Sequence, residues 1–400
     1  MKRPVSAVPG YVPLAGVVGA LIGWTLVRIL SIPMPWAPLL FLLGASVPMW
    51  ILELRRFPLV SFQTVNLSPW RRICRVYGLA GVILLFATTI SMFRLFASGA
   101  ISGLDEQISI CIILTLSWGA WILLRHPIYR SCDSVESLGY AILKCLRGGG
   151  WDAKSWGVLG GWSVKAFYLP LMVSSVGIFI QQSTLIVGYG FMAFFSAVYT
   201  LLFAVDTAFA TIGYCSTSRR VEAQIRSVEP TLGGWAVALV CYPPLNAVVL
   251  ARWLSYKDGY DWNNWLQGHP IVLMAWGVTI LLMVGLYVWA TVAFGLRFSN
   301  LTNRGIITSG PYRYFKHPSY IGKNVAWWLI SIPFISRVDF WHAFANSLSL
   351  LAINGIYIMR ALTEQRHLMR DQVYVEYSEW IDKNGIAGKL RELFLARLRG

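Results

Sequence analysis

The sequence predicts an all-α protein that crosses a membrane with about ten helices. Of its 400 residues, 56% are hydrophobic and only 13% are charged, whereas soluble domains carry roughly a quarter charged residues. The apolar residues also gather into runs of about 20 positions, the length at which a helix spans ~30 Å of hydrocarbon. These runs lie near residues 11–32, 35–52, 75–97, 106–124, 166–183, 185–212, 233–253, 270–295, 321–336 and 340–361.

The first run begins shortly after a small basic patch, Lys2 and Arg3. A secretory signal would continue into a cleavage site of small residues, and no convincing site of that kind follows here. We therefore interpret residues 11–32 as a retained first span.

Two runs in the middle of the chain contain residues that are unusual in a membrane span. Asp206 lies in the run at 185–212, where an acidic side chain is either a functional group or a paired structural acid. Pro243 and Pro244 lie in the run at 233–253. Because proline lacks the N–H donor and clashes with the preceding turn, this run should break or kink.

The formal net charge of +16 raises the question of a nucleic-acid partner. The cations fall in loops between apolar runs rather than on one basic module, which fits lipid head groups and topology signals better than a nucleic-acid backbone. Cation-rich loops alternate along the chain, so we predict an inner or plasma membrane protein with both termini cytoplasmic. The cations of these loops are Arg55, Arg56, Arg71, Arg72, Arg75, Lys144, Arg147, Lys154, Lys165, Arg219, Arg220, Arg226, Arg297, Arg304, Arg313 and Lys316.

Cysteine and histidine spacing gives no indication of a metal site or of a disulfide framework. The cysteines lack the CxxC and Cys/His spacings of zinc sites, and most adjoin apolar segments. We expect no bound metal. The six cysteines are Cys74, Cys111, Cys132, Cys145, Cys215 and Cys241.

The densest polar stretch lies at residues 309–323, with the sequence SGPYRYFKHPSYIGK. Its Gly-Pro pair favours a turn and Pro318 bars a helix through His317, so the backbone between them must be irregular. At a membrane edge, irregular backbone is tolerated only where it meets water, protein or a ligand. Pro318 suits the first turn of the next helix, whose free N–H groups favour a polar or anionic group beside His317 and Tyr320. The stretch is therefore a candidate binding pocket.

A similar pattern, RHPIY, occurs at residues 125–129. It lacks the Gly-Pro-Tyr-Arg lead-in and the glycine two positions after the tyrosine. We interpret it as the end of a span with a basic and aromatic anchor at the interface.

The last apolar run continues into a charged extension that carries a second polar group. Arg360, Glu364 and His367 follow one another at i, i+4 and i+7, so they share one face of a helix. Taken alone, Arg360 and Glu364 would be a solvated ion pair worth a few tenths of a kcal/mol. Their position after the loop at 309–323 is what makes them candidates for a common site.

Together, the two motifs resemble the isoprenylcysteine carboxyl methyltransferase and phospholipid methyltransferase superfamily. The resemblance covers roughly residues 265–400 and rests on GPYRYFKHPSYIG, then Arg360-x-x-x-Glu364-Gln365, then Tyr374-x-x-Tyr377. Enzymes of this superfamily span membranes and surround S-adenosylmethionine with such a loop and a downstream Glu-Glu pair. The resemblance implies a methyltransferase that uses S-adenosylmethionine from the cytoplasm and acts on a lipid or lipidated acceptor among the membrane lipids.

Carried over residue by residue, the resemblance also implies the members of the site. Glu364 and His367 are the catalytic candidates, as bases for an acceptor that must lose a proton. Three departures stand out: Lys316 replaces the usual arginine, Gln365 replaces the second glutamate, and the stretch before the Tyr374 and Tyr377 pair is short. The implied cofactor-binding residues are Tyr312, Arg313, His317, Tyr320, Gly322, Glu364 and Gln365.

The predicted organisation has two regions, an accessory transmembrane region at residues 1–230 and a methyltransferase-like core at 231–400 that ends in an amphipathic tail. One alternative is an NADPH-dependent membrane reductase of the sterol-reductase type, which also carries an H-P-x-Y-x-G loop. Against it, Lys323-Asn324 stands where those enzymes tend to have an acidic residue. The other alternative is a non-catalytic lipid-binding relative in which Gln365 marks a decayed site. Carboxyl, amine, phosphate-head and thiol acceptors all remain open.

Overall fold

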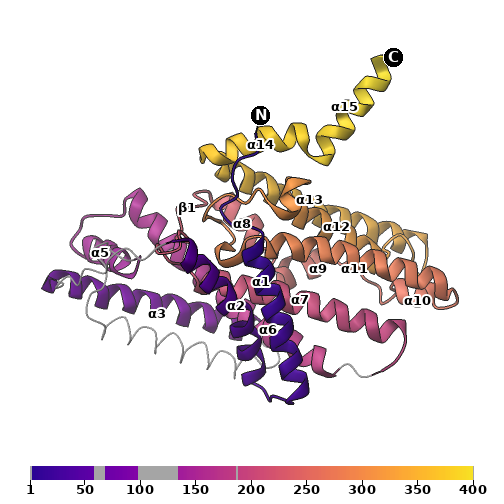
Figure 1. The fold of residues 1–400 in the computed structure, drawn as a ribbon, viewed down its shortest axis with the longest axis horizontal. Coiled ribbons are helices and arrows are strands. Elements are labelled where there is room, and N and C mark those ends of the chain that lie inside the picture. Colours follow the sequence, from indigo (N-terminus) through magenta and orange to yellow (C-terminus); the bar gives the residue numbers. More distant parts are fainter. Residues whose placement is uncertain (1, 58–67, 98–133, 186–187, 400) are drawn as a thin grey trace.

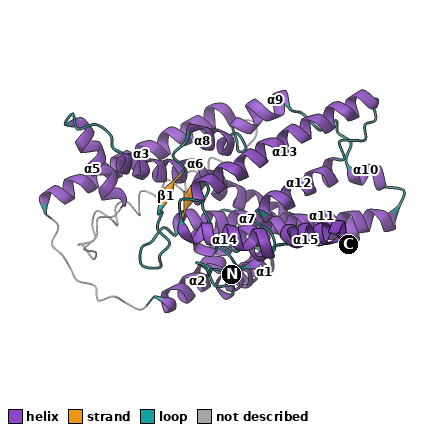
Figure 2. Cartoon of the chain, turned by 90° about the horizontal axis from the view of Figure 1, so that it is seen from above, coloured by secondary structure: helices purple, strands orange, loops and turns teal. Residues whose placement is uncertain are grey.

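The computed structural model of the protein describes residues 2–57, 68–97, 134–185 and 188–399 (Figure 1). Seen from above, these residues are mostly helical, with one short strand pair near the middle (Figure 2). The pair consists of β1 (Ser227–Val228) and β2 (Thr302–Asn303), which run antiparallel with Ser227 opposite Asn303. The predicted all-α class is confirmed.

Six helices in the described part of the chain are long and apolar enough to cross a membrane. The predicted run at 106–124 and the RHPIY pattern at 125–129 lie outside the described residues. The predicted total of about ten spans and the cytoplasmic placement of the termini stay predictions. The six helices are α1 (Tyr11–Ile29), α2 (Trp36–Arg56), α3 (Pro69–Ala97), α6 (Ala153–Leu185), α7 (Phe191–Cys215) and α11 (Pro270–Val292).

Three other predicted runs fold as helices of a different kind. The run at 233–253 is broken around Pro243 and Pro244 into α8 (Leu232–Leu239), a π-helical turn and α9 (Ala251–Trp253), as their missing N–H donors predict. The run at 321–336 gives α12 (Pro318–Ser331), whose 14 residues rise only ~21 Å. The run at 340–361 extends to α13 (Phe340–Leu368), which carries the charged second motif.

Shorter elements cover the ends of the long helices. Figure 1 shows α14 lying across one end of the bundle beside the N-terminus, with α15 continuing outward from it. Whether the amphipathic α15 lies on a membrane surface stays a prediction. These elements are α5 (Ser134–Leu146), α10 (Trp262–Leu266), the 3₁₀ turns Gly295–Arg297 and Gly310–Arg313, α14 (Gln372–Asn384) and α15 (Ile386–Arg399).

One apolar core joins the first and second halves of the chain. Phe41 of α2, Phe209 of α7 and Ile280 of α11 belong to this core, and each is fully shielded from solvent. Close helix contact supports it, since a Cβ at Gly19 of α1 would lie 2.0 Å from the carbonyl oxygen of Gly44 of α2. The α1 and α2 pair is therefore packed into the same body as α11, from which the site is built.

Candidate functional site

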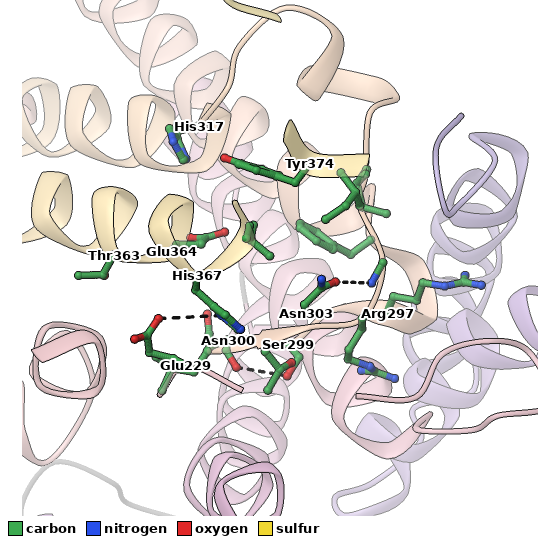
Figure 3. Close-up of a pocket in the computed structure, with 18 of the residues that line it drawn as sticks. Glu229, Arg297, Ser299, Asn300, Asn303, His317, Thr363, Glu364, His367 and Tyr374 are labelled. Atoms are coloured by element: carbon green, nitrogen blue, oxygen red, sulfur yellow. Dashed lines mark hydrogen bonds and ion pairs between the residues drawn. The ribbon is translucent and has the colours of Figure 1, made fainter. Parts of the chain in front are cut away.

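Two adjoining pockets lie where the 294–320 segment meets α13. The first, which we call the loop-side pocket, has an empty volume of about 890 Å³, part of it open to solvent (Figure 3). The second, the span-side pocket, has an empty volume of about 550 Å³ and lies among α11, α12 and α13. The residues that line both pockets are Phe294, Ser299, Asn300, Tyr312, Arg360 and Glu364.

The loop at 309–323 has the irregular backbone that its sequence predicts. It makes a 3₁₀ turn that starts at Gly310, which has a φ of +61°, and α12 then begins at Pro318. The C-terminal helices hold this loop in place, because the Tyr377 hydroxyl donates to the carbonyl oxygen of Tyr312 at 2.8 Å. Lys316 also bonds to the Asp382 carboxylate of α14, at 2.9 and 3.0 Å.

The two sequence motifs meet at Glu364. Its carboxylate accepts a hydrogen bond of 2.7 Å from the hydroxyl of Tyr320, which lies in the first turns of α12. Next to it, Nε2 of His317 lies 3.4 Å from the side-chain oxygen of Gln365. The structure therefore brings together the loop and the helix that the resemblance assigns to one site. Tyr312, His317 and Glu364 line the loop-side pocket, and Tyr320 lines the span-side pocket.

Arg360 is buried between the pockets rather than solvated beside Glu364. It is 8% exposed, and its guanidinium donates to the side-chain oxygen of Asn300 at 2.7 Å. The same guanidinium lies 5.2 Å from the ring centre of Tyr242 and 5.7 Å from that of Tyr320. Among the described residues, no carboxylate lies within ion-pair distance of it. A buried cation without an acidic partner is suited to an anionic group of a bound molecule.

His367 lies on the same face of α13 but is held by the β1 strand. Its Nε2 is 2.9 Å from the Ser227 hydroxyl. Its Nδ1 is 3.9 Å from the Glu229 carboxylate, as Figure 3 shows. Burial lowers the pKa of His367 below its ordinary value of 6.5, and Glu229 only partly opposes this shift. The imidazole is therefore neutral at pH 7. It lines the loop-side pocket and not the span-side pocket.

We expect acid to destabilise the protein partly through His367. Below pH 6.5 the unfolded chain binds a proton that the folded chain still excludes, so stability is lost as the pH falls from 6.5 through the lowered pKa. Thermal melts of wild type and His367→Gln between pH 7.5 and 5.5 measure this loss. The melting temperature of the variant should fall less than that of wild type. His269→Gln, at an exposed position, is the control and should behave like wild type; equal slopes in all three proteins would contradict the assignment.

Three residues that the resemblance implies as cofactor-binding line neither pocket. Arg313 is exposed, and Gln365 reaches only toward His317. Gly322 faces the backbone of α11, where an added Cβ would lie 2.5 Å from the carbonyl oxygen of Met283. Gly322 therefore allows α11 and α12 to approach closely. For all three residues, cofactor contact stays a prediction.

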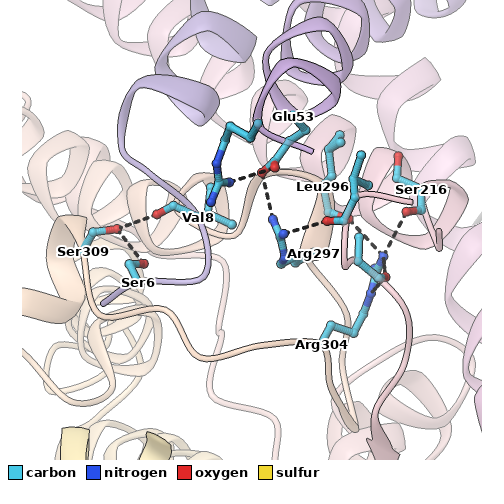
Figure 4. Close-up of polar contacts among 11 residues, drawn as sticks. Ser6, Val8, Glu53, Ser216, Leu296, Arg297, Arg304 and Ser309 are labelled. Atoms are coloured by element: carbon cyan, nitrogen blue, oxygen red, sulfur yellow. Dashed lines mark hydrogen bonds and ion pairs between the residues drawn. The ribbon is translucent and has the colours of Figure 1, made fainter. Parts of the chain in front are cut away.

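Two arginines that sequence analysis assigned to lipid-facing loops are buried structural residues. Arg297 is 2% exposed and bonds to the Glu53 carboxylate of α2 at 2.8 Å (Figure 4). Arg304 is 3% exposed and donates to backbone carbonyl oxygens, including those of Gly213 at 2.6 Å and Ala223 at 2.6 and 2.9 Å. The carbonyl oxygen of Gly213, in the last turn of α7, accepts the Ser216 N–H at 3.2 Å, and the planar guanidinium gives it a second donor. For these two cations, burial contradicts contact with lipid head groups, whereas their use as topology signals stays a prediction.

The segment before α1 packs against residues 306–309, next to the wall of the loop-side pocket. The backbone N–H of Ala7 donates to the carbonyl oxygen of Ile306 at 2.9 Å. The hydroxyl of Thr308 donates to the carbonyl oxygen of Pro4 at 2.8 Å. The Ser309 hydroxyl is also 3.1 Å from that of Ser6 (Figure 4). Because Ile306 lines the loop-side pocket, the segment before α1 forms an outer layer of its wall. No local pattern in the sequence marks this contact, since about 300 positions separate the partners.

Comparison with known proteins identifies the segment that carries the site. Residues 270–370 match the family described as "Isoprenylcysteine carboxyl methyltransferase (ICMT) family", and no curated protein or solved structure matches the chain. The matched segment runs from the start of α11 to just past the end of α13. It contains the 309–323 loop, Arg360, Glu364 and His367. The resemblance stated from the two motifs is confirmed, since residues 270–370 match the isoprenylcysteine carboxyl methyltransferase family.

Proposed function

We propose that the protein is an S-adenosylmethionine-dependent membrane methyltransferase that acts on a lipid or lipidated acceptor. The observation that carries this proposal is the pair of pockets that share Arg360 and Glu364. Methyl transfer needs the cofactor and the acceptor to be bound side by side with the reacting atoms aligned. This alignment can lower the activation free energy by several kcal/mol without a covalent catalyst. The loop-side pocket, lined by Tyr312 and His317 of the binding loop and by α14, suits the cofactor. The span-side pocket, among helices, suits an acceptor that arrives from the lipid.

The loop-side pocket has the chemistry to hold S-adenosylmethionine, which when bound supplies a methyl group on a sulfonium. Buried polar atoms of Thr302, Tyr374 and Arg297 in its wall have no hydrogen-bond partner among the described residues. Such atoms are costly to leave unpaired, so a polar ligand here would stabilise the protein. Glu364 and the face of Tyr312 suit a cation, and His317 suits a polar group near the start of α12.

Where the two pockets meet, the residues of this chain would orient the two reactants and exclude water. The Tyr320 hydroxyl fixes the Glu364 carboxylate at 2.7 Å, so the negative charge is held in place before any ligand binds. Should the acceptor be an amine, Glu364 is better placed than His367 to take its proton, because only Glu364 lines both pockets. The matched family is named for a carboxyl acceptor. An ionised carboxyl acceptor needs no base, and the buried Arg360 suits its charge.

The side of the membrane is part of the proposal. The N-terminal segment contributes to the outer layer of the loop-side pocket and α14 to its lining, and Figure 1 shows both at the same end of the molecule. If the loop cations orient the chain as the positive-inside rule predicts, this end is cytoplasmic. Residues 1–230 would then act as an accessory region that supports the pocket.

Calorimetric titration of the detergent-purified protein with S-adenosylmethionine, and separately with NADPH, tests the proposal. We expect saturable S-adenosylmethionine binding that weakens at least about tenfold in His317→Ala and Glu364→Ala, since each removes polar contact at the pocket. His342→Ala and Glu379→Ala, both at exposed positions away from the pockets, are matched controls and should bind like wild type. NADPH binding in place of S-adenosylmethionine would support the reductase alternative, and binding of neither would support a non-catalytic lipid-binding protein.

A further inference from the structure

The helix α15 carries an apolar face that the described residues leave uncovered. Ile386, Leu390, Leu393 and Phe394 follow one another at i, i+4, i+7 and i+8, so they share one face of the helix. These four residues are between 39% and 65% exposed. Figure 1 shows that α15 projects outward from α14 instead of packing on the bundle. An apolar face left in water is unfavourable, so it indicates a binding partner.

Basic residues flank this face. By helical periodicity, Lys389 and Arg391 fall on opposite sides of the apolar stripe. Both are exposed, and no hydrogen bond or ion pair reaches either side chain from the residues that the structure describes. Apolar side chains bordered by lysine and arginine are the arrangement with which a helix adsorbs to an anionic bilayer surface.

The balance of charge differs between the two C-terminal helices. In sequence, α15 holds four cations and one acidic residue, whereas α14 holds three acidic residues and one cation. Two of the acidic residues of α14, Glu376 and Glu379, are exposed. An anionic surface would therefore attract α15 and repel the outer face of α14.

The start of α15 is attached to the binding loop. The backbone N–H of Ile386 donates to the carbonyl oxygen of Tyr314 at 2.9 Å. Gly385, which joins α14 to α15, is buried, and an added Cβ there would lie 3.1 Å from the same carbonyl oxygen. Tyr374 and Tyr377 of α14 line the loop-side pocket. Any contact that holds α15 in place therefore also restrains α14 and this wall of the pocket.

We propose that α15 binds the anionic surface of the bilayer in which the protein sits, and that this contact keeps α14 in place in the wall of the loop-side pocket. A bilayer is the favoured partner because the same chain carries six helices long and apolar enough to cross one. The covalent link therefore keeps α15 at a high effective concentration near the head groups. The inference rests on the proposed function in one respect, namely that the loop-side pocket is the cofactor site.

Hydrogen–deuterium exchange of the protein in nanodiscs, with a single copy per disc, tests the contact without any ligand. One preparation contains phosphatidylcholine alone, and the other contains about one third phosphatidylglycerol. An uncovered helix of 14 residues frays, so the amides of α15 should exchange fast in the neutral discs. In the anionic discs we expect exchange in α15 and in α14 to be at least about fivefold slower at low salt. The difference should disappear at about 0.5 M salt.

Two pairs of substitutions on α15 separate the apolar and the ionic contribution. Leu393→Ser/Phe394→Ser removes the most exposed part of the apolar face, and Lys389→Gln/Arg391→Gln removes the flanking charges. Each pair should abolish most of the protection that anionic lipid gives to α15 and to α14. The four side chains are exposed, so the fold should tolerate these changes.

Arg252→Gln/Lys257→Gln is the matched control, because it also removes two exposed cations but lies outside α14 and α15. This variant should be protected like wild type. Equal exchange in neutral and anionic discs, or unchanged protection in the variant that lacks Lys389 and Arg391, would overturn the proposal. Slowing confined to α15 would refute its link to α14. Protection that requires two copies per disc, whatever the lipid, would assign the face to a second copy of this chain instead.

Calorimetry with S-adenosylmethionine on the same nanodiscs separates this proposal from the proposed function. Wild type should bind the cofactor at least about threefold more tightly in anionic than in neutral discs, and Lys389→Gln/Arg391→Gln should show no such difference. Lipid-dependent exchange without any cofactor binding would leave the α15 contact standing and remove the methyltransferase assignment. Cofactor binding without lipid-dependent exchange would do the reverse.

Discussion

Replacing Arg297 with methionine is expected to lower the free energy of unfolding by about 3–5 kcal/mol. The substitution keeps most of the side-chain length but removes a cation that bonds to Glu53 at 2.8 Å and to the carbonyl oxygen of Val221 at 2.8 Å. Both members of the ion pair are buried, at 2% exposure for Arg297 and 0% for Glu53. The loss therefore leaves a buried carboxylate with one less partner. Equilibrium unfolding in mixed detergent micelles measures the change.

Glu53 offers its own control, because a second arginine binds the same carboxylate. Arg56 lies 2.8 Å from Glu53 but is 26% exposed, so Arg56→Met should cost less than about 1 kcal/mol. The double variant Glu53→Gln/Arg297→Met should recover part of the loss in Arg297→Met, since it no longer buries a carboxylate whose buried partner is missing. A cost for Arg297→Met no greater than that for Arg56→Met would show that burial of the pair contributes little.

The fold class and the local shape of the binding loop could be predicted because short-range rules decide them. A chain with 56% hydrophobic residues has to place its apolar runs in lipid or in a large core. Within the loop, Gly310 accommodates a φ of +61° and Pro318 starts α12. Both effects depend only on the residue and its neighbours. The spacing of Arg360, Glu364 and His367 also predicted that they share one face of α13. The three residues line the same pocket.

The partners of these residues could not be predicted, because they come from distant parts of the chain. Arg297 and Glu53 are 244 positions apart, and Arg360 and Asn300 are 60 apart. Nothing in the local sequence separates a buried arginine from one that faces lipid head groups. The alternation of cations along the chain therefore placed Arg297 and Arg304 in the wrong environment.

The number of spans is difficult to predict for a different reason. Hydropathy marks an apolar run but not the length of helix that the run forms, and a predicted span at 321–336 became α12, with only 14 residues. Its short length follows from the loop that precedes it and from Ile332, which ends the helix in the left-handed conformation with a φ of +37°. The site therefore depends on a short helix whose register against α11 must be kept, and Gly322 is the residue on which that register depends.

Substitution of Gly322 by alanine is expected to destabilise the protein by about 1–3 kcal/mol. The added Cβ would lie 2.5 Å from the carbonyl oxygen of Met283 and 2.8 Å from the backbone nitrogen of Tyr287. Both are backbone atoms of α11, so α12 has to move instead of a flexible side chain. That movement would displace Tyr320 and Lys323, which lie on either side of Gly322, and should weaken binding in both pockets.

Gly355→Ala in α13 is the matched control, because a Cβ there meets no atom within 4 Å. In a helix interior this exchange should be neutral or stabilise the protein by up to about 1 kcal/mol. Unfolding in mixed micelles and calorimetry with S-adenosylmethionine, applied to both variants, separate the two roles considered for Gly322. A packing role predicts that Gly322→Ala loses stability even without ligand. A role limited to cofactor contact predicts weaker S-adenosylmethionine binding with stability equal to that of wild type, and that result would contradict the assignment of Gly322 to the α11–α12 contact.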